Sequence, residues 1–151
     1  MDSKTEREQR GISARDFRFY AFEALGGGHS ITEMLQAISG GFSSGKVIRL
    51  VAEYEIPEAL LHRTLQISRS TFQRRKRRGR FTTDESDRFV RLAGLYGMAE
   101  DVLGSKRDAS EWISTPNRSL GGVSPAELVV TETGAREVEE LLGRIAHGVA
   151  A

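Results

Sequence analysis

The feature that most constrains the fold is a series of three short helical patterns with almost no room between them, over residues 46–54, 57–65 and 69–78. Pro57 opens the second pattern, at a position where a proline suits the first turn of a helix. Ser68 precedes the third pattern, and its hydroxyl can cap that helix. Three short helices at this spacing predict a helix-turn-helix.

The sequence before this series also follows helical periodicity. An aromatic-rich segment, residues 15–25, predicts a first helix that ends at three consecutive glycines. Ser30 and Glu33 have capping-box spacing, and the apolar residues of the helix that follows lie on one face, namely Ile31, Met34, Leu35 and Ile38. Residues 1–14 are polar, charged and almost without large apolar side chains, so we expect a mobile tail there.

The longest helix is expected just after Arg80. Thr82 and Glu85 have capping-box spacing at its start, and one apolar stripe follows, formed by Phe89, Leu92, Ala93 and Tyr96. Residues of this kind at these intervals require burial and offer no chemistry, so we interpret the stripe as core. The helix should join the two halves of the chain mechanically.

Three shorter helices are expected in the last third of the chain. The first carries Trp112 and ends at Thr115, because Pro116 disfavours helical geometry in the residue before it. The second starts with a cap, a first-turn proline and a capping box, supplied by Ser124, Pro125 and Glu127. The third covers residues 133–147. We therefore expect an all-α protein with an N-terminal helix-turn-helix bundle and a second small helical domain.

The composition excludes several classes of protein. A chain of 151 residues can bury one modest core or two small ones, so we expect no large catalytic domain. It has no cysteine and only three scattered histidines, which predicts no metal site and no cofactor. No nucleophile, base and orienting group form a credible set, so we expect no enzyme. Without an apolar run of about 20 residues or a secretion signal, the sequence predicts a cytoplasmic protein with no membrane contact.

One glycine-rich segment is similar to a nucleotide-binding motif but departs from it. Residues 40–46, GGFSSGK, have the glycine and lysine spacing of a phosphate-binding loop. Val47 stands where that motif needs a serine or threonine, and no strand precedes the segment. We interpret it as a loop between helices.

The charge of the chain is strongly asymmetric although the net charge is only +1. Residues 1–80 carry 15 Lys and Arg against 9 Asp and Glu, a net charge of +6. Residues 81–151 carry 7 against 12, a net charge of −5. This asymmetry suggests that the two halves meet different partners, with a polyanion as the natural partner of the first half.

The basic residues gather on the third helix of the predicted helix-turn-helix, where seven of the twelve residues from 69 to 80 are Lys or Arg. At about 100° per residue, one arc of this helix is polar while Phe72 points nearly the opposite way. A DNA backbone would relieve the repulsion among the arginines, and arginine and glutamine can also read base edges. We therefore expect contacts with double-stranded DNA at Ser68, Arg69, Ser70, Gln73, Arg74, Arg75, Arg77, Arg78 and Arg80. A solvated basic face or an RNA-binding patch is the alternative.

Two features of the acidic half allow two interpretations each. Trp112, the only tryptophan, is either a core residue or an anchor for a partner. The final helix carries an apolar stripe, formed by Val138, Leu141, Leu142, Ile145 and Val149. This stripe packs within the chain, or it forms a dimer seam or a surface for another protein.

Two C-terminal segments carry a resemblance to a known family, EWISTPNRSLGGVSPAEL at 111–128 and ETGAREVEELLGRIAHG at 132–148. Together they resemble the C-terminal toxin-binding domain of Xre/MbcA/ParS-type antitoxins. The preceding run FTTDESDRFVRLAGL resembles the start of that region, and residues 46–80 resemble the helix-turn-helix of Xre antitoxins. Gln66 departs from the pattern, because a glycine commonly makes the turn there, so a different turn geometry or strain is expected.

The resemblance implies an antitoxin of a type II toxin-antitoxin system, with residues 15–80 as the DNA-binding domain and residues 81–151 as the toxin-binding domain. It implies a RES-domain toxin that consumes NAD, and repression of the antitoxin's own operon by a homodimer at a two-fold operator. The antitoxin C-terminus masks the toxin in this family, and the small tail suits a cleft. We expect toxin contacts at Trp112, Arg144, His147, Gly148, Val149, Ala150 and Ala151.

Two other functions remain open at this point. The chain could be a plain helix-turn-helix repressor whose C-terminal domain only dimerises. It could also be an adaptor whose arginines face an acidic protein. A steep dependence of DNA binding on salt would separate the adaptor from the other two, because phosphate contacts release counterions.

Overall fold

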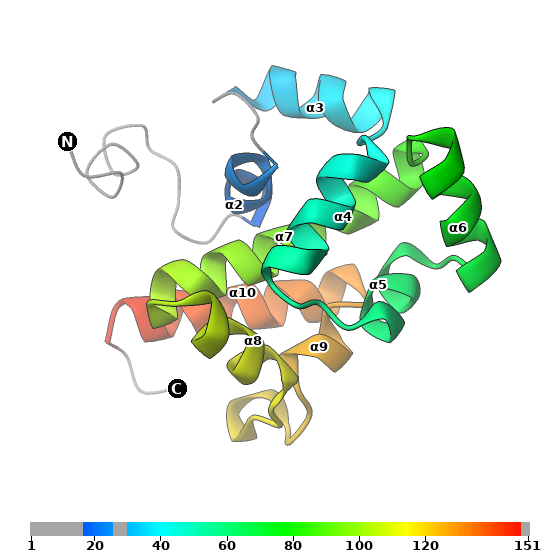
Figure 1. Cartoon of the computed structure of the whole chain (residues 1–151). Helices are drawn as coiled ribbons and strands as arrows, with labels where there is room; N and C mark the ends of the chain where they lie inside the picture. Colours follow the sequence, from blue (N-terminus) through cyan, green and yellow to red (C-terminus); the bar gives the residue numbers. More distant parts are fainter. Residues whose placement is uncertain (1–16, 26–29, 149–151) are drawn as a thin grey trace.

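The structure is a computed structural model that describes residues 17–25 and 30–148 (Figure 1). The described helices are α2 (Phe17–Ala24), α3 (Ile31–Gly40), α4 (Ser44–Glu53), α5 (Glu58–Leu65), α6 (Arg69–Arg78), α7 (Thr83–Leu103), α8 (Lys106–Ser114), the 3-10 helix η1 (Arg118–Leu120), α9 (Pro125–Leu128) and α10 (Glu132–Ala146). Within this part of the chain there is no β-strand, and only two isolated β-bridges occur. The predicted all-α fold is confirmed.

Local capping signals position most of the helix starts, as the sequence predicts. Ser30 and Ser68 each accept a hydrogen bond from the backbone N–H three residues on, at 3.1 Å. Thr82 and Ser124 go further and form complete capping boxes. These bonds satisfy backbone N–H groups that have no partner inside the helix.

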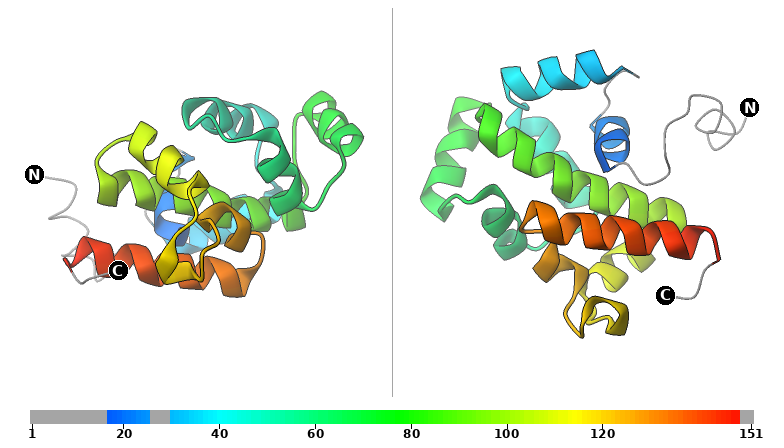
Figure 2. Two further views of the ribbon diagram at one scale, coloured as in Figure 1. Left: turned by 90° about the horizontal axis from the view of Figure 1, so that it is seen from below. Right: turned by 180° about the vertical axis from the view of Figure 1, so that it is seen from behind.

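Helix α7 is the central element of the fold. It is 21 residues long and packs against α2, α3, α5, α8 and α10. Figure 2 shows α7 and α10 lying side by side along the molecule. The predicted stripe of α7 is buried, because Phe89, Leu92, Ala93 and Tyr96 are each at most 1% exposed. The interpretation of this stripe as core is confirmed.

The basic and acidic halves share one hydrophobic core. A single cluster of buried side chains extends from Phe17 in α2 to Leu142 in α10. Gly94 of α7 lets α2 approach closely, since a Cβ atom there would lie 2.3 Å from the carbonyl oxygen of Phe17. A boundary after Arg80 therefore separates charge but not core.

The apolar face predicted for helix α3 is buried along only one of its edges. Met34 and Ile38 are buried, whereas Ile31 and Leu35 are 53% and 57% exposed. The four residues form a stripe about 100° wide, with Met34 at one edge and Leu35 at the other. The helix packs against α7, and the buried residues lie toward the Met34 edge of the stripe.

The final helix α10 buries its apolar stripe inside the chain. Val138, Leu141 and Leu142 are fully buried against the rest of the fold. Ile145 is partly exposed, and Val149 lies outside the described residues. Of the two interpretations of this stripe, packing within the chain is the one that the buried residues support.

Candidate nucleic-acid interface and partner-binding region

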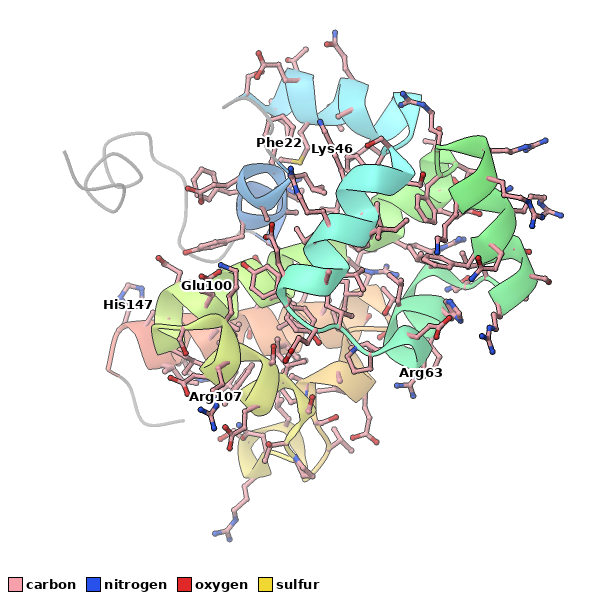
Figure 3. All side chains as sticks on the ribbon, in the orientation of Figure 1. Phe22, Lys46, Arg63, Glu100, Arg107 and His147 are labelled. Carbon is pink, nitrogen blue, oxygen red and sulfur yellow. The ribbon has the colours of Figure 1, made fainter. Side chains whose placement is uncertain are left out.

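One aromatic residue of helix α6, Phe72, packs it against the rest of the fold. Phe72 is buried, and its ring lies 5.1 Å from that of His62 in α5 and 5.8 Å from that of Phe81, which precedes α7. This contact turns the opposite face of α6 toward the surface. Figure 3 shows side chains with nitrogen tips projecting from the outer side of α6.

The outer face of α6 holds most of the residues that the sequence singled out. Arg69, Ser70, Arg74, Arg77 and Arg78 are exposed, and Gln73 is partly exposed. Lys76, which the sequence prediction left out of the contact set, is exposed as well. The arrangement brings several cations and one amide together on a single helix of a size that fits a DNA major groove.

Ser68 serves first as the N-cap of α6. Its hydroxyl oxygen accepts from the Thr71 N–H at 3.1 Å and lies 3.1 Å from the Ser70 hydroxyl. It also donates to the Thr71 hydroxyl at 3.0 Å. These bonds fix the first turn, whose outward amides suit an anion such as a phosphate.

Arg75 faces the protein and not the outer surface. Its Nε and Nη2 donate to the Glu85 carboxylate of α7 at 2.8 to 3.0 Å, and the two side chains are 12% and 5% exposed. The hydrogen bond to Glu85 raises the pKa of Arg75. Burial alone would raise the pKa of Glu85, but hydrogen bonds from Arg75 and Thr82 outweigh it and lower that pKa. We therefore assign Arg75 to the fold.

Arg80 ties two turns together. Its Nη1 donates to the carbonyl oxygens of Gly40 at 3.2 Å and Gly41 at 2.5 Å. Next to it, the Phe81 N–H donates to the Phe42 carbonyl at 3.0 Å. The turn between α6 and α7 is thus bonded to the turn between α3 and α4, and the exposed Arg80 already has two acceptors.

The turn between α5 and α6 has a left-handed backbone conformation, which is unfavourable for the glutamine that occupies it. Gln66 ends α5 in the left-handed region, with φ 57° and ψ 44°. A side chain that is not glycine is strained there. Of the two expectations for this turn, a different geometry or strain at Gln66, the structure shows strain.

The structure makes His62 a packing residue. Its ring lies against Phe72, and its side chain is only 16% exposed. The His62 Nε2 lies 3.7 Å from a carboxylate oxygen of Glu58 on the same helix. His62 therefore helps to seat α6.

Of the predicted toxin-binding residues, the structure describes Trp112, Arg144, His147 and Gly148. Trp112 is half-buried and packs against the core, which supports its core interpretation in part. Arg144 is partly exposed, and His147 and Gly148 are exposed at the end of α10. Val149, Ala150 and Ala151 lie outside the described residues.

The segment between α8 and α9 forms a small hairpin. Asn117 and Val123 pair in an antiparallel bridge, and Gly121 and Gly122 both have positive φ. The Asn117 side chain accepts from the Ser119 N–H at 2.9 Å. The glycine pair was the signal for this turn.

Among residues 17–25 and 30–148, no three His, Cys, Asp or Glu side chains come together as they would around a metal ion. No helix in the same part of the chain combines the length and the apolar composition that crossing a bilayer requires.

The sequence is similar to proteins of a known family. A family model described as the antitoxin Xre-like helix-turn-helix domain matches residues 33–94, and the antitoxin Xre/MbcA/ParS C-terminal toxin-binding domain matches residues 98–148. A protein of Yersinia enterocolitica named Antitoxin Xre is 42% identical over 120 residues, which are 78% of this chain and 81% of the relative. The chain belongs to the Xre antitoxin family.

Further relatives of this antitoxin carry related names. A protein of Photorhabdus laumondii named Antitoxin Xre is 42% identical over 54% of this chain and 55% of its own. A protein of Sphingobium sp. named Prs ADP-ribosylating antitoxin is 26% identical over 97% of this chain and 98% of its own. The two matched domains meet inside α7, so this helix belongs to both.

Proposed function

We propose that this Xre-type antitoxin neutralises a RES-domain toxin that consumes NAD and represses its own operon. The proposal rests on the match to the toxin-binding domain over residues 98–148, together with the outward cationic face of α6. Figure 1 places α6 and the end of α10 at opposite ends of the molecule, an arrangement in which one chain can hold DNA and a toxin together. Cells that express the neighbouring toxin should grow only when this chain is present.

The DNA-binding part of the proposal assigns phosphate contacts to the exposed cations of α6. Arg69, Arg74, Arg77 and Arg78 would neutralise the backbone, and Gln73 would lie closest to the base edges. Each phosphate contact contributes about 0.9 to the slope of log affinity against log salt. A salt titration on operator DNA should therefore give a slope of several units, and a flat response would leave the adaptor alternative.

The toxin-binding part assigns the contact to the end of α10 and the tail. His147 is exposed there, and the neighbouring Gly148 leaves the backbone accessible to a cleft. Deleting residues 148–151 should abolish neutralisation while DNA binding stays unchanged. Full neutralisation by the shortened chain would refute the role of the tail.

The chemistry of the toxin can be tested separately. The Sphingobium relative is named for ADP-ribosylation, which also takes its group from NAD. We place a RES-domain toxin first because it is the toxin that the resemblance to Xre antitoxins implies, and the Yersinia relative, which matches most of both chains, is named Antitoxin Xre. Loss of cellular NAD without ADP-ribose on any protein is the expected result, and labelled protein would point to a transferase instead.

A homodimer is the proposed oligomer, because two-fold operators are bound by two-fold proteins. Light scattering on the free antitoxin and a gel shift with one or two half-sites test it. The alternative function is a plain repressor whose C-terminal domain only dimerises. Failure to co-purify with the product of the neighbouring gene, with operator binding intact, would favour that alternative.

A further inference from the structure

Two charged side chains on α7 contact the two ends of the segment that runs from the end of α5 through α6. Glu85 and Arg88 are three residues apart, so they lie on the same side of the helix. Glu85 accepts from Arg75 near the end of α6, and Arg88 Nη1 donates to the Leu65 carbonyl at the end of α5. Neither residue belongs to the outer face of α6.

The contact between Arg75 and Glu85 can fix an orientation because it has three hydrogen bonds. Arg75 Nε and Nη2 both reach the carboxylate, at 2.8 to 3.0 Å, so the guanidinium cannot rotate freely. Glu85 is itself held by the Thr82 N–H at 2.9 Å, within the capping box. The end of α6 is thereby locked to the first turn of α7.

The Arg88 contact does the same at the turn before α6. The Leu65 carbonyl is one of the last four of α5, which lack a partner inside the helix. Arg88 satisfies it at 3.2 Å, next to the strained Gln66. The entry to α6 is therefore anchored to the same helix as its exit.

We infer that Glu85, Arg75 and Arg88 are positioning residues for DNA binding, which set the angle of α6 without contacting DNA. The inference rests on the proposed DNA binding by α6. Arg75, in the middle of the arginine cluster, would then contribute to DNA affinity through its bond to Glu85 and not through a phosphate contact. A DNA contact and a positioning residue differ in their response to salt, which makes the inference testable.

The decisive variants are Arg75→Lys and Glu85→Gln, studied in the full chain. Lysine keeps the charge and can still bind a phosphate, but it cannot form the two-pronged bond to Glu85. Glutamine keeps the shape of Glu85 and removes the charge that Arg75 needs. Affinity for operator DNA should fall about tenfold in each, because fewer molecules hold α6 in the competent orientation. The slope against salt should equal that of the wild type.

Matched controls come from exposed positions with the same chemistry. Arg136→Lys replaces an arginine of α10 whose side chain is 72% exposed, and this variant should bind DNA as the wild type does. Glu132→Gln removes a carboxylate that accepts from Arg136 at 3.0 Å, in a pair that is 69–72% exposed. It should leave DNA binding unchanged.

Arg88→Met is a third test variant. It keeps the apolar stem, loses the bond to Leu65, and should weaken DNA binding without changing the slope.

Each outcome decides the inference. Wild-type affinity in Arg75→Lys or Glu85→Gln overturns it, and so does a slope that differs from that of the wild type, because the number of phosphate contacts would then have changed. Complex formation with the toxin and helix content by circular dichroism should stay at the wild-type level. A variant that loses both counts against the inference, because the pair would then hold the whole fold. If the wild type itself does not bind DNA, the proposed DNA-binding function is wrong. The wild-type measurement therefore distinguishes failure of that function from failure of this inference.

Discussion

Replacing three helical glycines with alanine tests how closely α2 packs against α7. Each change gains about 1 kcal/mol of helix propensity at an interior position. The spatial surroundings of the three sites differ sharply. A Cβ atom at Gly94 would lie 2.3 Å from the Phe17 carbonyl oxygen and 2.6 Å from the Phe17 Cβ. At Gly97 the nearest atom is the Tyr20 Cβ at 3.1 Å, and at Gly45 nothing lies within 4 Å.

These distances predict three different free energies of unfolding. Helix α2 would have to move by about 1 Å to admit Gly94→Ala, at a cost of about 3 kcal/mol for an overpacked core, so the variant should be less stable by about 2 kcal/mol. At Gly97 the steric cost and the propensity gain should nearly cancel. Gly45→Ala, in the first turn of α4, should gain up to about 0.5 kcal/mol because it meets no obstacle.

Urea unfolding followed by far-ultraviolet circular dichroism measures the free energy of each variant. The expected order of stability is Gly45→Ala first, then Gly97→Ala, then Gly94→Ala. Gly94→Ala at or above wild-type stability would refute the close approach of Phe17 to α7. Because Gly45 lies on the open side of α4, its variant controls for propensity alone.

Three further predictions concern the DNA-binding unit. Gln66→Gly should raise the free energy of unfolding by about 1 kcal/mol, because glycine tolerates the left-handed geometry; urea unfolding checks this. Ser68→Ala should lower it by about 1 kcal/mol through loss of the α6 cap, and an unchanged value would mean that the cap contributes nothing. The folded-state pKa of Glu85 lies below its unfolded value, so its stabilisation is complete above about pH 5 and is lost as the pH falls through the folded-state pKa. The stability difference between the wild type and Glu85→Gln should therefore shrink on acidification, and a difference independent of pH would contradict the ion pair.

Much of the helical layout is local and could be predicted from the sequence. Ser30, Ser68, Thr82 and Ser124 each cap the helix that the spacing indicated. Capping depends on residues within one turn of each other, so sequence neighbours suffice to identify it. The burial of Phe72 followed in the same way, because helical periodicity separates the two faces of α6.

Side-chain partners across the fold could not be predicted in this way. Arg74 and Arg75 are neighbours in an arginine run, yet only Arg75 meets a carboxylate, which comes from the next helix. The exposure of Ile31 and Leu35 has the same origin, since packing against distant segments decides which edge of the α3 stripe is covered.

Periodicity, capping and charge are properties of residues close together in the chain, so they already indicate a helical protein, the starts of its capped helices and the helix that gathers positive charge. The fold as a whole decides which charges remain available to a partner, and it joins the two halves in one core through α7. Those outcomes depend on contacts between distant segments, and burial makes such contacts strong enough to remove a side chain such as Arg75 from the surface.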